Sequence, residues 1–135
     1  MPTINKFEEL EVWKLAREIE QFTFNLTKEE LLSKDFKLKN QMNDSSSSVM
    51  SNIAEGFGRG GRLEFVNFLS FAKGSATELQ SQYYNCLDRK YISEDRFHQV
   101  YQMIEILCKK TSAFMAYLNQ SEKKGQKFQN RKINS

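Results

Sequence analysis

The sequence contains very few residues that interrupt helices. Its 135 residues include one proline and six glycines, and five of the glycines fall between positions 56 and 74. A β fold with many turns needs more of both residue types, distributed along the chain. The scarcity excludes such a fold and favours a few long helices in one domain, for which this length suffices to bury a core.

Long apolar runs are also missing. No segment approaches the roughly 20 consecutive apolar residues that a membrane-spanning helix requires. The N-terminus, MPTINKFEELEVWK, is too acidic and too interrupted for a signal peptide. A chain with only two cysteines fits a reducing compartment. We therefore expect a cytoplasmic protein that contacts no membrane and takes no small-molecule substrate.

The two cysteines, Cys86 and Cys108, are too far apart for a disulfide. If the helices that carry them form a hairpin around residue 91, their axial offset is on the order of 18 Å. A disulfide requires Cα atoms within about 7 Å of each other. We expect two small core residues rather than a disulfide or reactive thiols.

Histidine is scarce as well. His98, three residues after Asp95, is the single histidine. A di-metal centre in a helical bundle needs two Glu-x-x-His motifs and two further carboxylates, and a nucleophilic serine or cysteine needs a histidine beside it. The neighbouring carboxylates of Glu29 and Glu30 lie in a connector with no pocket implied. The sequence predicts no catalytic residue, no metal site and no cofactor, so we expect a protein that is not an enzyme.

Four segments carry the apolar periodicity of helices. They extend roughly from Phe7 to Leu26, from Asp35 to Gly56, from Arg62 to Arg89, and from a Ser93 N-cap to Asn119. Short connectors join them, which predicts an all-α fold, an antiparallel up-down four-helix bundle in residues 1–120. After Asn119 the periodicity ends, and the sequence predicts a flexible, disordered basic tail in residues 121–135.

The run NDSSSS at residues 43–48 has the composition of a linker, because serine is a mediocre helix former. The apolar period nevertheless enters the run at Met42 and leaves it in phase at Val49. This continuity favours a helix in which the small serines permit close approach of a neighbouring helix.

The stretch SNIAEGFGRGGRLEFVNFL contains the spelling G-x-G-x-x-G at Gly56, Gly58 and Gly61. A dinucleotide-binding fingerprint needs a strand before the first glycine and a βαβ unit around it. Here a helical stripe precedes the glycines, and the chain offers no βαβ elements. We therefore interpret the stretch as a corner between two helices. Gly56 or Gly58 would supply the positive φ of a helix C-cap, and Gly60 and Gly61 would turn the chain.

The same stretch carries a family resemblance. SNIAEGFGR, followed by EF..FL.FAKGSATEL and YIS, resembles the four-helix-bundle proteins encoded within 23S rRNA intervening sequences, which are related to the accessory variability proteins of diversity-generating retroelements. The opening helix, FEELEVWKLA, is similar too, and the resemblance covers roughly residues 7–119. It implies a bacterial four-helix bundle that assembles into pentamers and has a nucleic-acid or ribonucleoprotein role.

One departure from the family pattern bears on that role. The family carries a basic pair in its second helix, shortly after a Leu-x-x-Gln motif. Here the motif is Leu38-Lys-Asn-Gln41, and the matching positions hold Asn43 and Asp44. Losing two cations weakens the electrostatic term that supplies most non-specific nucleic-acid binding. Other cations can compensate, unless they form an ordinary solvated surface. These candidate contacts are Lys37, Lys39, Arg59, Arg62, Lys73, Lys123 and Lys124.

The polar residues around the glycine stretch have a structural interpretation. Glu55 and Arg59 lie four apart and can pair on a helix, and Asn52 lies on the helix face nearest the corner. We expect a cap-and-salt-bridge cluster that fixes this corner against the third helix, with contact to a partner as the alternative. Its predicted members are Asn52, Glu55, Gly56, Gly58, Arg59, Glu64 and Glu78.

Some apolar side chains of the third helix lie off its core stripe. Phe71 falls roughly 120° from the core direction on one side, and Val66 and Tyr84 fall about 100° from it on the other. Apolar residues on such flanks suit a subunit interface. We predict interface roles for these three residues, with scattered surface apolar residues as the alternative.

Net charge does not by itself indicate nucleic-acid binding. The chain carries +3, but residues 121–135 hold five basic side chains and one acidic, which leaves 15 basic and 16 acidic in residues 1–120. We expect a non-catalytic, oligomeric accessory module that associates with RNA or DNA. The alternative is a structural assembly or protein-interaction protein without nucleic-acid binding, which Asn43, Asp44 and the neutral body favour.

Overall fold

The structure is a computed structural model that describes the backbone of residues 3–133 and the side chains of residues 3–120. Within that range the chain forms five α-helices and one short 3₁₀ helix, and no strand. The elements are η1 (Phe7–Glu9), α1 (Glu11–Thr27), α2 (Glu30–Ser33), α3 (Phe36–Gly58), α4 (Arg62–Asp88) and α5 (Glu94–Ile133). The predicted all-α fold is confirmed.

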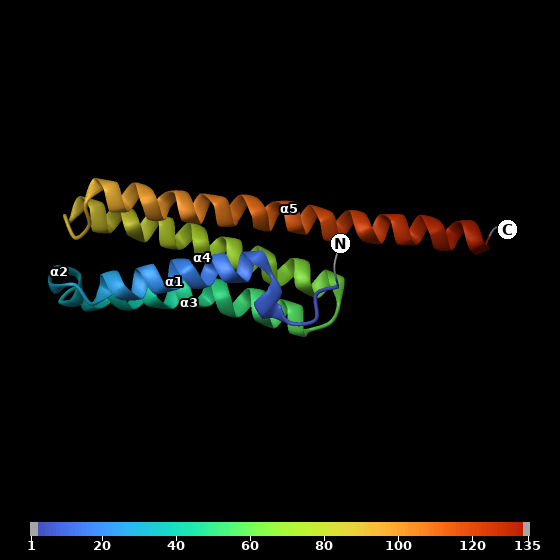
Figure 1. The fold of residues 1–135 in the computed structure, drawn as a ribbon, viewed down its shortest axis with the longest axis horizontal. Coiled ribbons are helices and arrows are strands. Elements are labelled where there is room, and N and C mark those ends of the chain that lie inside the picture. The colour runs from blue at the N-terminus through green and yellow to red at the C-terminus, as the bar shows by residue number, and fades with distance from the viewer. Residues whose placement is uncertain (1–2, 134–135) are drawn as a thin grey trace.

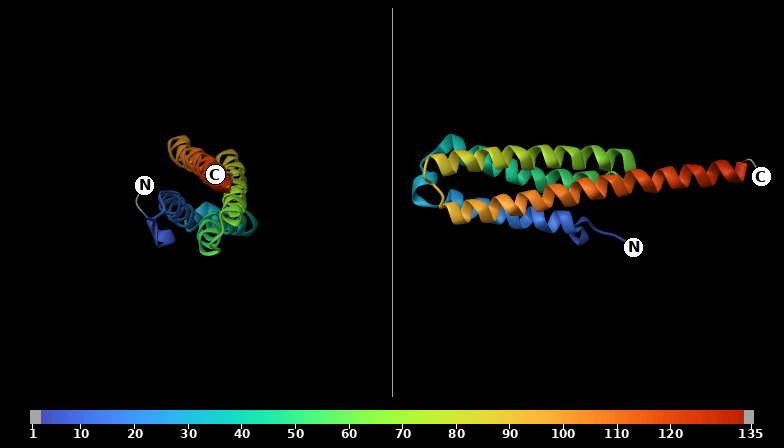
Figure 2. Two further views of the ribbon diagram at one scale, coloured as in Figure 1. Left: turned by 90° about the vertical axis from the view of Figure 1, so that its right-hand side faces the viewer. Right: turned by 90° about the horizontal axis from the view of Figure 1, so that it is seen from above.

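The four long helices form an antiparallel up-down bundle (Figure 1). α1 lies against α3, α3 against α4 and α4 against α5, and α5 closes the ring by contacting α1. The end-on view in Figure 2 shows this ring. The short helix α2 turns the chain between α1 and α3 at one end of the bundle. The topology is the one that the periodicity predicted.

The apolar stripes of the sequence form the core, and α3 shows this most clearly. The positions that the period selects on this helix are all buried: Leu38, Met42, Ser45, Val49 and Ile53. The run NDSSSS lies inside α3, so the helical interpretation is confirmed. Its serines also connect α3 to α4, because the hydroxyl groups of Ser48 and Ser75 lie 2.9 Å apart.

The glycines at the corner between α3 and α4 have roles that differ from the prediction. α3 continues through Gly56 and Gly58, and the positive φ, 80°, falls on Gly60. The prediction that Gly56 or Gly58 adopts this conformation is therefore wrong. Gly56 is buried against α4 instead, where an added Cβ would stand 2.5 Å from the Cβ of Phe68. The absence of a side chain at Gly56 lets the two helices meet.

Helix α5 is longer than its apolar stripe. The stripe ends near Asn119, but the helix backbone continues to Ile133 and extends beyond the bundle as a single helix (Figures 1 and 2). Lysine, glutamine and glutamate propagate a helix well, and no proline follows in the sequence. The predicted helix end at Asn119 is corrected accordingly. Flexibility of residues 121–135 stays a prediction, since their side chains lie outside the described residues.

The cysteines take the positions expected of core residues. Cys86 is buried on α4 and Cys108 is half-buried on α5, and both are free thiols. The Sγ atom of Cys86 lies 3.3 Å from Sδ of Met42. Burial raises the pKa of the Cys86 thiol to about 12, so this group remains protonated and unreactive at neutral pH.

Acid–base pairs close the end of the bundle that lies opposite the glycine corner. Arg96 donates two hydrogen bonds to the carboxylate of Glu29, at 2.7 and 3.0 Å. Asp35 accepts the Leu38 amide at 3.4 Å as the N-cap of α3. The same carboxylate accepts a hydrogen bond from the Tyr91 hydroxyl at 2.9 Å and one from Arg89 at 2.8 Å. The Asp35 contacts tie α3 to the connection between α4 and α5, and the Glu29–Arg96 pair ties the connection between α1 and α2 to α5.

Candidate nucleic-acid interface

The cations predicted to contact nucleic acid do not gather in one patch. Lys37 and Lys39 lie at the start of α3 and Arg59 directly after its end, roughly 33 Å away along the helix axis. Arg62 opens α4, and Lys73 is half-buried midway along that helix. Lys123 and Lys124 lie outside the described side chains. The structure therefore distributes the described cations over both ends of the bundle and the middle of α4.

Arg59 at the glycine corner is held by neighbours of its own helix and of α4. Its Nη2 atom lies 2.8 Å from Oε1 of Glu55, so the predicted pairing is confirmed. The hydrogen bond to Glu55 raises the pKa of Arg59. The guanidinium also lies 5.2 Å from the centre of the Phe68 ring. The pair is about half exposed, which leaves the cation accessible while it braces the corner.

Arg62 connects the corner to α5. Its Nη1 atom donates a hydrogen bond to Oδ1 of Asn119 at 2.7 Å. Asn119 is the position at which the apolar stripe of α5 ends, and the helix backbone extends beyond the bundle from this region (Figure 1). A cation and a projecting helix thus meet at this end of the bundle.

The remaining members of the predicted corner cluster divide between two places. Asn52 donates to the carbonyl of Ser48 at 2.9 Å on α3, next to the Ser48–Ser75 contact that joins α3 to α4. Glu64 is exposed in the first turn of α4. The placement of Glu78 at the corner is wrong. This residue lies about four turns further along α4, where Gln82 donates to its carboxylate at 3.4 Å.

Asn43 and Asp44, which replace the family's basic pair, point to different neighbours. The Asn43 side chain and the Thr27 hydroxyl of α1 lie 3.3 Å apart. Asp44 lines a polar groove between α3 and α4, together with Gln41, Ser48, Ser75 and Glu78. Because two carboxylates border this groove, it repels phosphate rather than attracting it.

Exposed aromatic rings are the surface feature that the sequence interpretation missed. Phe24 near the end of α1 is 45% exposed, and Phe36 at the start of α3 is 68% exposed. A lysine lies beside each ring, Lys28 near Phe24 and Lys39 near Phe36. Their sequence signal was available, because both rings fall off the apolar stripes of their helices.

The predicted interface residues lie on two separate flanks of α4. Phe71 is 58% exposed and packs edge-on against Phe68, whose neighbours include Gly56 of α3. Tyr84 is 48% exposed and packs against Phe97 of α5. Val66 is half-buried. The predicted interface residues therefore define an α3-side flank and an α5-side flank of α4.

The described residues hold no group of three or more histidine, cysteine, aspartate or glutamate side chains that could bind a metal ion. His98 is exposed and packs beside Phe97. Among the same residues, no helix has the length and apolar character to cross a lipid bilayer.

Comparison with known proteins finds relatives of the same fold. The family model described as 23S rRNA-intervening sequence protein matches residues 8–113. The chain is also similar to a solved structure, a protein of unknown function from the S23 ribosomal protein family of Bacteroides thetaiotaomicron. The TM-score is 0.70 at 21% identity, over 78% of this chain and 95% of the other. At this identity the likeness shows a shared fold alone. No curated protein matches the chain.

Proposed function

The chain belongs to the 23S rRNA-intervening sequence protein family, and on this premise we propose that it is a non-catalytic, oligomeric accessory protein that associates with nucleic acid in a ribonucleoprotein. The family match, which spans most of the bundle, is the observation that carries the proposal. Cytoplasmic localisation is part of it, because ribosomal and messenger RNA occur in that compartment.

The charge distribution supports the C-terminal end of α5 as one contact with nucleic acid. Residues 121–135 hold five of the basic side chains against one acid, while residues 1–120 are nearly neutral. The helix that begins at Glu94 carries this segment away from the bundle. A projecting basic segment can approach a phosphate backbone without desolvating the neutral body, and each phosphate contact adds to the electrostatic affinity.

Assembly is the second part of the proposal. A closed ring such as the pentamer implied by the resemblance needs two different surfaces on each subunit, because its contacts are head-to-tail. Phe71 on the α3-side flank and Tyr84 on the α5-side flank of α4 supply two such apolar surfaces. We propose that these flanks meet between neighbouring copies.

A structural assembly protein without nucleic-acid binding is the alternative, and a specific observation favours it. Asn43 is engaged with Thr27, and Asp44 and Glu78 make the neighbouring groove acidic. The helix face that is basic in the family is therefore not basic in this chain. If the alternative holds, the basic segment after residue 120 serves solubility or a protein partner.

A binding titration tests the proposal. Fluorescent structured RNA and duplex DNA are titrated with the full chain and with residues 1–120 at about 50 mM salt, where electrostatic binding is strong. The truncation preserves the core, because the last buried residue of the described chain is Thr111. We expect the full chain to bind RNA, with an affinity that falls steeply as salt rises.

The outcomes separate the two functions. Binding by the full chain that weakens on truncation supports the proposed function and assigns part of the affinity to residues 121–135. Absence of binding by both proteins rules out the nucleic-acid proposal and leaves the assembly function.

A further inference from the structure

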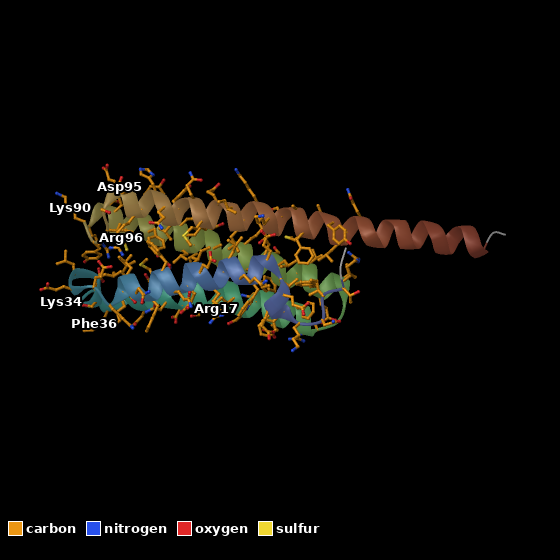
Figure 3. All side chains as sticks on the ribbon, in the orientation of Figure 1. Arg17, Lys34, Phe36, Lys90, Asp95 and Arg96 are labelled. Atoms are coloured by element: carbon orange, nitrogen blue, oxygen red, sulfur yellow. The ribbon has the colours of Figure 1, made fainter. Side chains whose placement is uncertain are left out.

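Two exposed rings at the α2 end of the bundle each carry a cation. The Nζ atom of Lys28 lies 4.2 Å from the centre of the Phe24 ring, and that of Lys39 lies 5.7 Å from the centre of the Phe36 ring. Phe36 is the most exposed large apolar side chain of the described residues, at 68%. Figure 3 shows it projecting outward from the start of α3.

The two ring–lysine pairs lie along one seam of the molecule. On α1, Phe24 is three residues before Thr27, so the Phe24–Lys28 pair shares a helix face with Thr27. On α3, Lys39 is four residues before Asn43, so the Phe36–Lys39 pair shares a helix face with Asn43. The Asn43–Thr27 contact at 3.3 Å joins the two faces. From the helix rise, the rings are separated by roughly 15 Å along the seam. We call Phe24, Lys28, Phe36 and Lys39 the α1/α3 strip.

The acids of the connection between α1 and α3, which lies beside the strip, are neutralised. Each acid of the α1–α3 connection has a basic partner: Glu29 pairs with Arg96, Glu30 with Lys34 and Asp35 with Arg89. No ion pair among the described residues holds Lys28, Lys37 or Lys39. Lys28, Lys37 and Lys39 are therefore uncompensated cations that lie on the strip or beside it.

We propose that the α1/α3 strip binds single-stranded nucleic acid, with unpaired bases stacking on Phe24 and Phe36 and with Lys28 and Lys39 neutralising the adjacent phosphates. This inference rests on the proposed function and names its substrate class and contact surface. Every base has a π face that stacks on an aromatic side chain. On binding, each lysine exchanges its contact with the ring for a contact with a phosphate.

The composition of the strip favours this ligand over two others. A duplex keeps its bases stacked internally and offers phosphates alone, which leaves two exposed phenylalanines unused. A membrane surface requires a continuous apolar helix face, whereas here Lys39 and the polar side chains of Asn40 and Asn43 lie on α3 between the levels of the two rings. Alternating rings and cations are the pattern of single-strand binding surfaces.

The test compares variants of the full chain against three labelled probes of equal length: single-stranded RNA, single-stranded DNA and duplex RNA. Phe24→Ala and Phe36→Ala should each weaken binding of both single strands about fivefold or more, the loss expected for one stacked base. Duplex binding should stay unchanged. Tyr117→Ala is the matched control, because Tyr117 is also 45% exposed but lies on α5.

The lysines have a distinct signature. The variant Lys28→Gln/Lys39→Gln should reduce the slope of log affinity against log salt for single strands by about 1.4, since each neutralised phosphate contributes about 0.7. Lys109→Gln, an exposed lysine on α5, should change this slope less. The phenylalanine variants should leave the slope unchanged, because they remove stacking and no charge.

Several results would overturn the inference. If both phenylalanine variants bind with wild-type affinity, the strip is not the binding surface, but the proposed function is unaffected. If the wild-type chain binds none of the probes, both the strip and the proposed function are rejected. An equal loss for duplex RNA contradicts stacking. If the phenylalanine variants have a lower mass by light scattering than the wild type, the strip is a contact between copies of the chain. Binding to phosphatidylcholine–phosphatidylserine vesicles that depends on Phe24 and Phe36 makes it a membrane surface. Circular dichroism establishes that each variant is folded.

Discussion

At the scale of single residues, Gly56 and Gly74 show that two glycines on helices can differ completely in their roles. A Cβ at Gly56 would stand 2.5 Å from Cβ of Phe68, whereas no packing neighbour lies within 4 Å of the equivalent position at Gly74. The first glycine permits the contact between α3 and α4. Gly74 lowers the stability of α4, since glycine in a helix interior is less favourable than alanine, and it makes no close packing contact that would compensate.

Alanine substitutions at the two glycines should therefore act in opposite directions. Gly56→Ala should lower the free energy of unfolding by about 1–3 kcal/mol, because the added methyl group forces the helices apart. Gly74→Ala should raise it by about 0.5–1 kcal/mol. Urea unfolding followed by circular dichroism measures both. A Gly56→Ala variant as stable as the wild type would contradict the close packing of α3 on α4.

A buried hydroxyl pair offers a second test at this scale. The Thr23 and Tyr83 hydroxyl oxygens lie 2.6 Å apart in the core. Tyr83→Phe should cost about 1–2 kcal/mol, because it leaves a buried hydroxyl without its partner. Adding Thr23→Val removes that unpaired group, so the double variant should lose less than the sum of the two single losses. Strictly additive losses in this double-mutant cycle would refute the interaction, and Tyr117→Phe serves as the exposed control.

The sequence predicted contacts between residues one turn apart on the same helix. It did not predict contacts between residues on different helices. The Glu55–Arg59 pair follows from a spacing of four residues. The misplacement of Glu78 could have been avoided, because the 17 residues between Gly61 and Glu78 correspond to roughly 25 Å along a helix. The ring–lysine pairs could have been found in the same way, because Phe24 and Phe36 fall off the apolar stripes and each has a lysine three or four residues later.

At the scale of elements, the helix ends depend on contacts that differ in kind. Asp35 caps α3 and also binds Tyr91 and Arg89 from the connection between α4 and α5. The hydrogen bond from Tyr91 lowers the pKa of Asp35, and those from Leu38 and Arg89 lower it further. One carboxylate thus starts a helix and fixes its position relative to the neighbouring hairpin.

This arrangement predicts a pH-dependent stability. Because the pKa of Asp35 is lowered in the folded state, its contribution is present above the unfolded pKa of about 3.9 and is lost as pH falls through the folded value. Asp35→Ala should cost about 1–2 kcal/mol at pH 7. The difference from the wild type should shrink as the pH falls from about 5 towards 2.

Unfolding midpoints across that pH range measure the effect. Glu30→Gln is the control, since the exposed Glu30–Lys34 pair should contribute less than about 0.5 kcal/mol. A stability gap between Asp35→Ala and the wild type that stays constant down to pH 2 would contradict the assigned role of the carboxylate.

The elements were predictable to within a few residues wherever an apolar stripe meets the core. The apolar stripe through NDSSSS identified α3 although the run is rich in serine. The spacing of the buried positions, and not the residue types between them, indicates the helix. Two helices extend past their predicted ends for different reasons. The last turn of α3, which ends at Gly58, is packed, because Phe57 contacts Phe65 of α4. α5 continues to Ile133, where the local sequence tolerates a helix beyond the bundle.

At the scale of the whole molecule, the proposed ring predicts that each flank of α4 is needed for assembly. Phe71→Asp or Tyr84→Asp alone should reduce the mass measured by light scattering, because every contact in a head-to-tail ring uses both flanks. Ile106→Asp, at an exposed position of α5, is the control. An unchanged mass in both α4 variants would exclude these flanks as the interface.

The most direct test of the central proposal is light scattering behind a sizing column, applied to the full chain mixed with labelled structured RNA at low salt. The proposal of an oligomeric nucleic-acid-associated protein predicts one peak that contains RNA together with several copies of the chain. A protein peak at the monomer mass of 15.9 kDa, with the RNA eluting separately at its free position, would contradict both oligomerisation and nucleic-acid association.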